Sequence, residues 1–359
     1  MTRRRTVSAT LAGLIIGASM LVAAAPVAAN GPRSQIEVLL QGLSSPKGID
    51  VSPTSVFIGQ GAYGPPAGPV LEYIFKGKGH GTSRPLTGPL NLIDIAGTPD
   101  GAGWGIGADG KLYRQATPNG TPSAILDIHA YQAADPDPYN NPMEDPKESN
   151  PFGLTALPNN EVLVADAAGN DIIRVNKNGK AVTVARFTRE SVKTDKVGDP
   201  TLPPRIDAEA VPTSIALGRD GFAYVGQLMG FPGRPKSAHI WRINPYRQDA
   251  VCTADKPTKK CKVWKSGFTS IIDLAFNPKN GTLYVYEIAR KGWLAFEEGF
   301  KTGVFPPAVL LEVKGHSIRE LVRGKLSQPG GVAVAPDGSI FVTDGMFGNG
   351  RLIRLRKDD

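Results

Sequence analysis

Cysteine and histidine are scarce in this chain. Its 359 residues include only 2 Cys and 4 His. Two cysteines exclude a scaffold built on disulfides and a zinc site made of four cysteines. The four histidines lie far apart in the sequence, so they give no cluster with metal-ligand spacing.

Sequence motifs of several common enzyme classes are also missing. There is no Gly-x-Ser-x-Gly and no His-Glu-x-x-His, and the glycines at 101–110 lack the Gly-Lys-Ser/Thr ending of a phosphate loop. Long helical periodicity is absent after the first 30 residues. The chain therefore does not show the signature of a serine hydrolase, a zinc protease or a P-loop nucleotidase.

The first 29 residues have the pattern of a signal peptide. Arg3, Arg4 and Arg5 precede an apolar stretch from 11 to 25, and small residues at 27–29 suit cleavage after Ala29. The alternative is a membrane anchor, but the apolar stretch is shorter than the ~20 residues of a spanning helix, and Pro26 interrupts it. We expect a secreted protein of residues 30–359 without a transmembrane segment. The pattern leaves Sec and twin-arginine export open.

The net charge gives little guidance to partners. Lys and Arg number 41 against 33 Asp and Glu, and loss of the three leader arginines lowers the formal charge from +8 to +5. We interpret this small excess, without a basic cluster, as ordinary solubility. Nucleic acid is not an expected partner of an exported chain.

The remaining chain is organised by six repeats. Each repeat joins two alternating apolar segments through a tight turn, and the clearest copies are 153–166 and 331–344. Asn-Gly and Asp-Gly suit such turns because these residues accept positive φ. The turns recur every 47 to 61 residues, near Thr54, Gly101, Asn160, Gly221, Gly281 and Gly338. Six four-stranded units of this size predict an all-β, six-bladed β-propeller.

The last repeat lacks one strand, and the N-terminal segment offers it. Residues 35–40 alternate like a strand but precede the first repeat. We therefore expect them to close the last blade. The blades are predicted near residues 43–90, 91–149, 150–209, 210–269, 270–326 and 327–357 plus 35–40.

Propeller geometry sorts the loops between two faces. We define the channel-mouth face as the face from which the chain reaches each innermost strand. The long segments all fall on this face, whereas the turns between first and second strands lie on the opposite face. These long segments are 61–69, 130–149, 188–208, 228–237, 288–307 and 345–350. Long loops on a rigid scaffold often carry function, although drift of surface insertions is the alternative.

Four segments resemble a known family. They are Asn150-Pro-Phe-Gly-Leu, Leu163-Val-Ala-Asp-Ala-Ala-Gly-Asn, Ala210-Val-Pro-Thr-Ser-Ile-Ala-Leu and Gly267-Phe-Thr-Ser-Ile-Ile-Asp-Leu-Ala-Phe. In them the chain resembles the ScyD/ScyE family, which is similar to the NHL, SMP-30 and TolB-like propellers. The resemblance spans about residues 35–357 and implies export and a propeller. It implies no settled activity.

Aligning the repeats predicts a polar ring at the mouth of the central channel. The position before each inner strand reads Gly48, Asp94, Gly153, Ser214, Asp273 and Gly331. Three residues earlier stand Ser45, Asn91, Asn150, Val211, Ser270 and Gln328. Asp94 and Asp273 belong to opposite blades, so they could share a Ca²⁺ ion. The alternative is that each carboxylate accepts backbone N–H groups and lines a water-filled channel.

A second polar series ends the second strands, at Gln60, Asp166, Gln227, Glu287 and Asp344. In lactonase-type propellers an acidic and amide set binds a divalent metal, but their first-repeat Glu is replaced by Lys47-Gly48 here. Structural capping is the alternative role for Asp166 and Asp344. The acidic, proline-rich segment 135–149 could clamp a cation or act as a stiff lid. Our ligand-binding candidates are Asn91, Asp94, Asn150, Ser214, Asp273, Glu287 and Gln328.

Cys252 and Cys261 fall in a connection between third and fourth strands, and an oxidising compartment would join them in a disulfide. The alternative is two free thiols.

Together these observations favour an exported, non-enzymatic propeller that binds a small molecule, a glycan or a protein through its channel-mouth face. The alternative is a metal-assisted hydrolase of the lactonase kind with its site at the channel mouth. The sequence offers acids for such an enzyme but no clear base.

Overall fold

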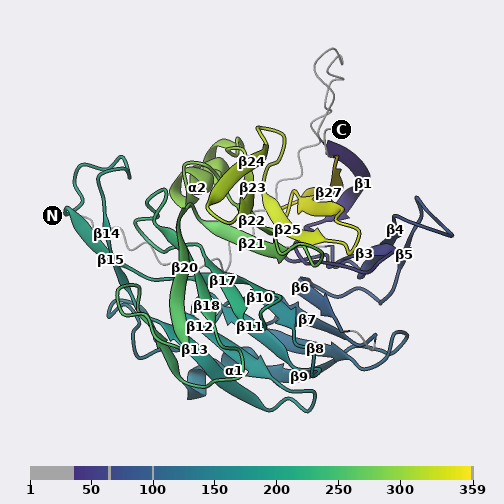
Figure 1. Cartoon of the computed structure of the whole chain (residues 1–359), viewed down its shortest axis with the longest axis horizontal. Helices are drawn as coiled ribbons and strands as arrows, with labels where there is room; N and C mark the ends of the chain where they lie inside the picture. Colours follow the sequence, from purple (N-terminus) through teal and green to yellow (C-terminus); the bar gives the residue numbers. More distant parts are fainter. Residues whose placement is uncertain (1–35, 64–65, 99–100, 357–359) are drawn as a thin grey trace.

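The repeating hairpins form six small sheets around a common centre (Figure 1). The structure, a computed structural model, describes residues 36–63, 66–98 and 101–356. The predicted signal peptide, residues 1–29, lies outside this part of the chain. The six sheets make a six-bladed β-propeller, which confirms the predicted fold class.

The strands of each blade run from the channel outward in chain order. Blades 1 and 2 contain β2 (Ile49–Val51), β3 (Ser55–Ile58), β4 (Leu71–Ile74), β5 (Ser83–Pro85), β6 (Leu92–Gly97), β7 (Gly103–Gly107), β8 (Lys111–Gln115) and β9 (Ser123–Asp127). Blades 3 and 4 contain β10 (Pro151–Ala156), β11 (Val162–Asp166), β12 (Asp171–Val175), β13 (Ala181–Phe187), β16 (Pro212–Leu217), β17 (Ala223–Gln227), β18 (Ala238–Ile243) and β20 (Cys261–Phe268). Blade 5 contains β21 (Ile271–Phe276), β22 (Leu283–Glu287), β23 (Val309–Lys314) and β24 (Ser317–Val322).

Blade 6 combines both ends of the described chain. Its inner three strands are β25 (Pro329–Val334), β26 (Ile340–Asp344) and β27 (Asn349–Leu355), and its outer strand is β1 (Ile36–Ser44). β1 pairs antiparallel with β27 from Ile36↔Leu355 to Ser44↔Asn349. The N-terminal strand therefore closes the last blade, as the sequence predicts. Leu43 of β1 is buried in a cluster that joins blade 6 to blade 1.

The turns behave as their sequences indicate. Asn160, Gly101, Gly221, Gly281 and Gly338 all have positive φ. Apolar residues at alternate positions on the strands then face the neighbouring blade, and separate clusters fill the interfaces of blades 2–3, 3–4, 4–5, 5–6 and 6–1. The inner strands contact one another in sequence around the ring, and β25 contacts β2. The core is therefore distributed between the blades rather than gathered in one layer.

Three short strands lie in the connections of blades 3 and 4. β14 (Glu190–Lys193) and β15 (Arg205–Ala208) form a hairpin in the connection from blade 3 to blade 4. β19 (Ala250–Cys252) lies in the third-to-fourth connection of blade 4 and pairs in parallel with β13 of blade 3. Cys252 and Cys261 form a disulfide with Cα atoms 5.5 Å apart, which confirms the predicted pairing.

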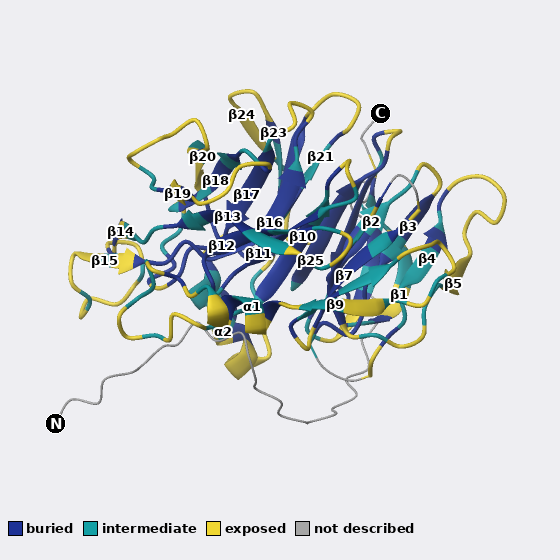
Figure 2. Cartoon of the chain, turned by 90° about the horizontal axis from the view of Figure 1, so that it is seen from below, coloured by how far each residue is buried: buried dark blue, intermediate teal, exposed yellow. Residues whose placement is uncertain are grey.

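Two short helices occur in the described residues, α1 (Ile128–Ala134) and α2 (Trp293–Thr302). They lie on the same side of the disk (Figure 2). Both belong to segments that the sequence assigns to the channel-mouth face. Neither helix of the described chain is long and apolar enough to cross a membrane.

Candidate functional site

The predicted channel residues lie on the inner strands and link one blade to the next. Oδ2 of Asp94, on β6, accepts a hydrogen bond from the backbone N–H of Leu154 in blade 3 at 2.9 Å. Oδ2 of Asp273, on β21, accepts one from the backbone N–H of Val332 in blade 6 at 2.7 Å. Each carboxylate thus satisfies a donor on the next inner strand. The two residues occupy equivalent positions in opposite blades and have the same structural task.

Glycines at the other ring positions allow the inner strands to approach closely. A Cβ atom at Gly153 would lie 2.5 Å from the backbone O of Thr213, and one at Gly331 would lie 2.7 Å from that of Lys47. Real Cβ atoms do not tolerate such distances to backbone. The ring position is therefore glycine where the backbones of adjacent inner strands touch. It is Asp94 or Asp273 where a side chain bonds to the next inner strand.

Lys47 is a channel residue whose role the sequence analysis missed. Its side chain is 1% exposed, and its Nζ lies 3.8 Å from Oδ2 of Asp94. The same Nζ lies 4.3 Å from the centroid of the Phe152 ring, in a cation–π contact. The signal was present at the position where Lys47-Gly48 replaces the glutamate of lactonase-type propellers.

Burial and neighbouring charges raise the pKa values of the carboxyl groups in the channel. Burial raises the pKa of Asp273 to about 7, the negative charge of Asp94 adds to this rise, and Lys47 opposes it. Burial also raises the pKa of Asp94, against the opposing effect of Lys47. Asp50, on β2, has its pKa raised to about 6 by burial despite hydrogen bonds from the N–H groups of Gly97 and Val51. The channel thus combines three perturbed carboxyl groups with one ammonium group.

This arrangement bears on the calcium hypothesis for Asp94 and Asp273. Within residues 36–63, 66–98 and 101–356, no group of three or more His, Cys, Asp or Glu is placed to hold a metal ion. Lys47 already places a positive charge beside Asp94, and both carboxylates accept backbone N–H bonds. Calcium binding at Asp94 and Asp273 therefore stays a prediction.

The other ring candidates are placed through their backbones. Gln328 has a φ of 51°, and its carbonyl accepts the N–H of Met346 at 3.0 Å. The N–H of Asn150 donates to Oδ1 of Asp166 at 2.6 Å. Ser214 is 1% exposed, and no described residue offers its Oγ a hydrogen-bond partner. Ser214 is the ring residue with an unused polar atom.

Asn91 packs against a loop of the preceding blade. A Cβ atom at Gly61 would lie 2.5 Å from Oδ1 of Asn91, so this close packing requires glycine there, and Gly61 also has a φ of 80°. The Asn91 side chain is therefore packed against a loop of blade 1.

An apolar cluster joins residues from several long segments of the channel-mouth face. Phe296 of α2 is fully buried and contacts the rings of Trp293, Phe305 and Phe347. Its cluster includes Phe152 at the start of β10 and residues from four long segments of the mouth face. We call this cluster the aromatic plug. Ring residues hold the loops of the plug, because Oγ of Ser270 accepts the N–H of Trp293 and the carbonyl of Gln328 accepts the N–H of Met346.

Side chains of the polar series at the ends of the second strands accept backbone N–H groups of the segments that lead into the inner strands. Oε1 of Gln60 accepts the N–H of Ser44 at 2.9 Å, and Oε1 of Glu287 accepts the N–H of Thr269 at 2.7 Å. Asp166 caps the equivalent segment of blade 3. Burial raises the pKa of Glu287 to about 8, so this group is largely protonated at neutral pH.

The remaining two members of that series contact neighbouring strands of their own blades, and Gln227 also donates to Glu190 of β14 at 3.4 Å. Asp344 forms an ion pair with Arg351 on the neighbouring strand β27. Gln227 accepts a hydrogen bond from the indole Nε1 of Trp241 on β18. These contacts give both side chains a structural role.

The acidic segment 135–149 is attached to the disk by polar contacts. Glu209 accepts the N–H of Asn141 at 2.9 Å, and Arg189 donates to the carbonyl of Tyr139 at 3.2 Å. Burial, together with the negative charge of Glu209, raises the pKa of Glu144 to about 7. The segment is thus tied to the connection between blades 3 and 4.

Large apolar side chains remain exposed around the plug. Phe300 is 52% exposed and Val304 75% exposed, at the C-terminal end of α2 and just beyond it. Met143 and Phe231 are also exposed and belong to two other long segments of this face. Four of the exposed large apolar side chains of the described residues thus belong to long segments of the channel-mouth face or to α2 within them.

Comparison with known proteins agrees with the propeller fold. Residues 326–355 match the NHL repeat family. No curated protein matches the sequence.

Solved propellers with very different descriptions share the architecture. A soluble aldose sugar dehydrogenase from Escherichia coli is 12% identical, with a TM-score of 0.51, over 89% of this chain and 99% of that one. A streptogramin B lyase is 14% identical, with a TM-score of 0.50, over 89% and 97%. A chain of a nidogen/laminin complex is 11% identical, with a TM-score of 0.50, over 81% and 85%. Similarity at these identities shows the fold alone.

Proposed function

We propose that this protein is an exported, non-enzymatic propeller of the ScyD/ScyE type that binds an apolar surface of a partner through its channel-mouth face. The observation that carries the proposal is the exposure of Phe300, Val304, Met143 and Phe231 on one face. Exposed large apolar side chains that lie close together on a folded protein, as Phe300 and Val304 do in sequence, can mark an interaction site. The disulfide supports export, because disulfides persist mainly in oxidising compartments.

The support under this surface suits binding. Phe300 contacts the rings of Phe296, Phe305 and Phe347. Because Phe296 is fully buried, the exposed edge of Phe300 is held by packed aromatic rings rather than by a free loop. A partner that covers Phe300 and Val304 would remove apolar area from water at little cost in ordering.

The alternative is an enzyme that uses Asp94 and Asp273 in the channel. A carboxyl group with a pKa near 7, such as that of Asp273, is suited to general acid–base catalysis. Against this function, both carboxylates are engaged by backbone N–H groups, and Asp94 also by Lys47.

Binding of the neutral apolar dye Nile red tests the proposed surface. We expect the native protein to enhance its fluorescence, and Phe300→Ser combined with Val304→Ser to remove most of that enhancement while Tm changes little. Ile318→Ser is the matched control, because Ile318 is 43% exposed on β24 at the outer rim. Equal dye binding by all three proteins would refute the apolar site.

Calorimetric titration of EDTA-treated protein with Ca²⁺ or Mg²⁺ tests the enzyme alternative. Binding that disappears in Asp94→Asn and Asp273→Asn would support the metal-assisted enzyme. Absence of both heat and a shift in Tm would remove it.

A further inference from the structure

We propose that the face opposite the channel mouth carries a second site, a lysine cluster that binds an anionic polysaccharide. The cluster lies in the disulfide-closed loop of blade 4, which reads Lys256-Pro-Thr-Lys-Lys-Cys-Lys262. Four of these seven residues are lysines, a density typical of polyanion-binding segments. This inference is independent of the proposed function of the mouth face.

The charges of the cluster are free to meet a ligand. Lys256, Lys259, Lys260 and Lys262 are all exposed. None of the four forms a salt bridge with a described residue, although Nζ of Lys260 donates to the carbonyl of Gln248 at 3.3 Å. Asp255 is the one carboxylate within the loop. Four unneutralised ammonium groups in one short loop repel one another, and an anionic chain would relieve that repulsion.

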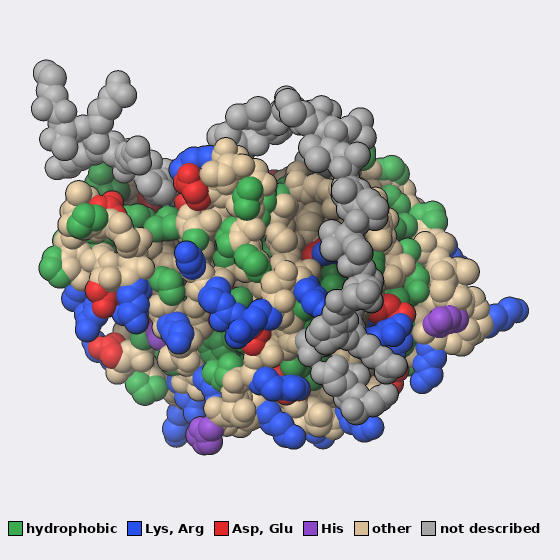
Figure 3. Space-filling model, turned by 90° about the horizontal axis from the view of Figure 1, so that it is seen from above, with side chains coloured by type: hydrophobic (Ala, Val, Ile, Leu, Met, Phe, Trp, Pro, Cys, Tyr) green, Lys and Arg blue, Asp and Glu red, His purple; other side chains and the backbone are tan. Residues whose placement is uncertain are grey.

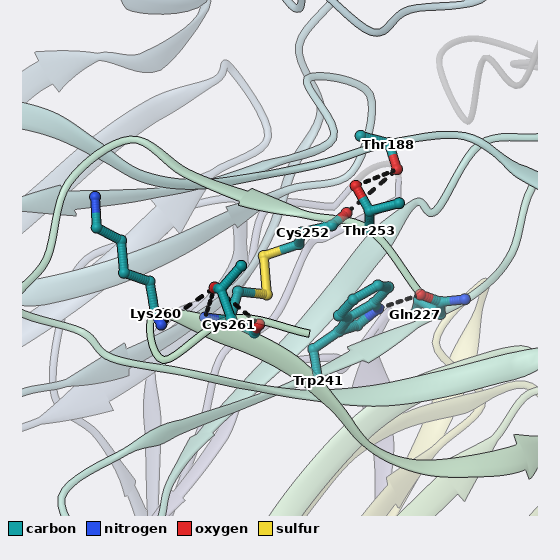
Figure 4. The surroundings of a disulfide bond; sticks show 8 residues. Thr188, Gln227, Trp241, Cys252, Thr253, Lys260 and Cys261 are labelled. Carbon is teal, nitrogen blue, oxygen red and sulfur yellow. Dashed lines mark hydrogen bonds between the residues drawn. A yellow bond between two sulfur atoms is a disulfide. The ribbon is translucent and has the colours of Figure 1, made fainter. Parts of the chain in front are cut away.

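The loop is held in shape although it lies at the surface. The Cys252–Cys261 disulfide joins its ends, with Trp241 of β18 close by (Figure 4). The N–H of Lys256 donates to the carbonyl of Thr253 at 3.1 Å, and Oγ1 of Thr258 accepts the N–H groups of Lys260 and Cys261. Two hydrogen-bonded turns and a covalent closure thus fix the backbone. Binding would therefore cost little backbone entropy.

Basic side chains continue around the cluster. Arg242 is the cross-strand partner of Lys262 but is paired with Asp220, whereas Arg247 is exposed in the adjoining turn. Other turns of this face carry Arg219 and Lys279, which are in contact through a hydrogen bond from Arg219 to the carbonyl of Lys279. An extended anionic chain would find further positive charge beyond the loop itself.

The whole C-terminal half of the disk shares this charge. Residues 36–209 contain 15 Lys and Arg against 20 Asp and Glu, whereas residues 210–356 contain 21 against 11. Lys and Arg side chains gather on the side of the molecule shown in Figure 3. This asymmetry corrects our interpretation of the net charge, because the small overall excess conceals an acidic half and a strongly basic half. A field of this kind attracts polyanions from solution.

The disulfide points to the class of polyanion. Its oxidising environment is one in which acidic polysaccharides, rather than nucleic acids, are the abundant linear polyanions. Lysine supplies a compact point charge suited to carboxylate, sulfate or phosphate groups without a demand for planar geometry. We therefore assign the site to an anionic polysaccharide, with sulfate or carboxylate groups as the recognised chemistry.

Heparin is the probe for the test, with neutral dextran as its uncharged counterpart. The test variant replaces Lys256, Lys259, Lys260 and Lys262 by Gln. The control variant replaces Lys76, Lys78, Lys291 and Lys325 by Gln, which removes the same charge from exposed lysines elsewhere. Affinity is measured by calorimetry or fluorescence at several ionic strengths, and Tm confirms folding.

We expect the wild-type protein to bind heparin and not dextran, with an affinity that falls as salt rises. The test variant should lose at least about tenfold in affinity at low ionic strength and show a weaker salt dependence, whereas the control should lose less than about threefold. Phe300→Ser combined with Val304→Ser should bind heparin normally. Equal losses in the test and control variants would overturn the site, and tighter binding of a DNA oligonucleotide or of anionic vesicles than of heparin would overturn the polysaccharide assignment.

Discussion

Replacing one side chain of the closing strand should destabilise the entire propeller. Leu43 of β1 is 3% exposed and packs in one cluster with Val56 and Ile58 of blade 1 and with Phe341 and Leu352 of blade 6. It therefore holds together the only two blades that are far apart in the sequence yet neighbours in the ring. We expect Leu43→Ala to weaken that junction.

The size of the effect follows from burial. Replacing a buried Leu by Ala typically costs about 2–5 kcal/mol, since transfer free energy is lost and a cavity is left. Leu43 is enclosed from both blades, so we expect about 3 kcal/mol. At about 2 °C per kcal/mol for a large domain, Tm should fall by about 6 °C. Val38→Ala on the same strand is the control, because Val38 is 36% exposed, and it should cost less than about 1 kcal/mol.

Chemical denaturation followed by tryptophan fluorescence measures both variants. If closure is part of one cooperative unit, Leu43→Ala shifts the midpoint of the whole transition without changing the m-value. A main transition at the wild-type midpoint would refute this reasoning, because it would mean that β1 separates without affecting the ring. As a second comparison, a chain that begins at Gly42 should unfold at lower denaturant than one that begins at Arg33.

Three further predictions concern the channel, the plug and the disulfide. Because burial and Asp94 raise the pKa of Asp273 from 3.8 to about 7, the folded state binds this proton more tightly, and the stability that it contributes is complete below about pH 4 and lost as pH rises through about 7. Asp273→Asn should flatten that part of the pH–stability profile and raise stability at pH 8 by up to a few kcal/mol; an unchanged profile would contradict the shift. Phe296→Ala should cost about 3–5 kcal/mol in denaturation and also reduce Nile red binding, whereas loss of neither would show that the plug is not packed as described. Cys252→Ser with Cys261→Ser should lower stability by about 2–3 kcal/mol, as expected for closure of a short loop, and should abolish the effect of reductant on the wild-type midpoint.

The architecture was predictable because its determinants are local. Strand alternation and tight turns depend on neighbouring residues, and a missing strand at one end matched an unused strand at the other. Turn positions such as Asn160 and Gly221 have the positive φ that their types favour. Closure then followed from counting strands.

The site was less predictable because it depends on residues distant in sequence. The plug brings Phe152, Phe296 and Phe347 together only after the blades are placed. The helix α2 spans ten residues between glycines, too few for a helical period to stand out from a loop. Lys47 was visible as a departure from a family pattern, but its burial beside Asp94 required the geometry of two blades.

The lysine cluster does not stand out in the sequence for a different reason. Its lysines flank two cysteines, and the net charge of the whole chain is small because the two halves offset each other. Only the division of the disk into halves shows that the excess positive charge belongs to residues 210–356.

Pairing of Ile36 with Leu355 places the two ends of the propeller side by side. A short peptide could therefore fuse them, and new ends could be opened in an exposed turn such as that near Gly281. In such a circularly permuted protein, β1 would follow β27 directly, so the whole of blade 6 would be synthesised as one continuous segment. The order in which the blades are synthesised would change, but the finished ring would be the same.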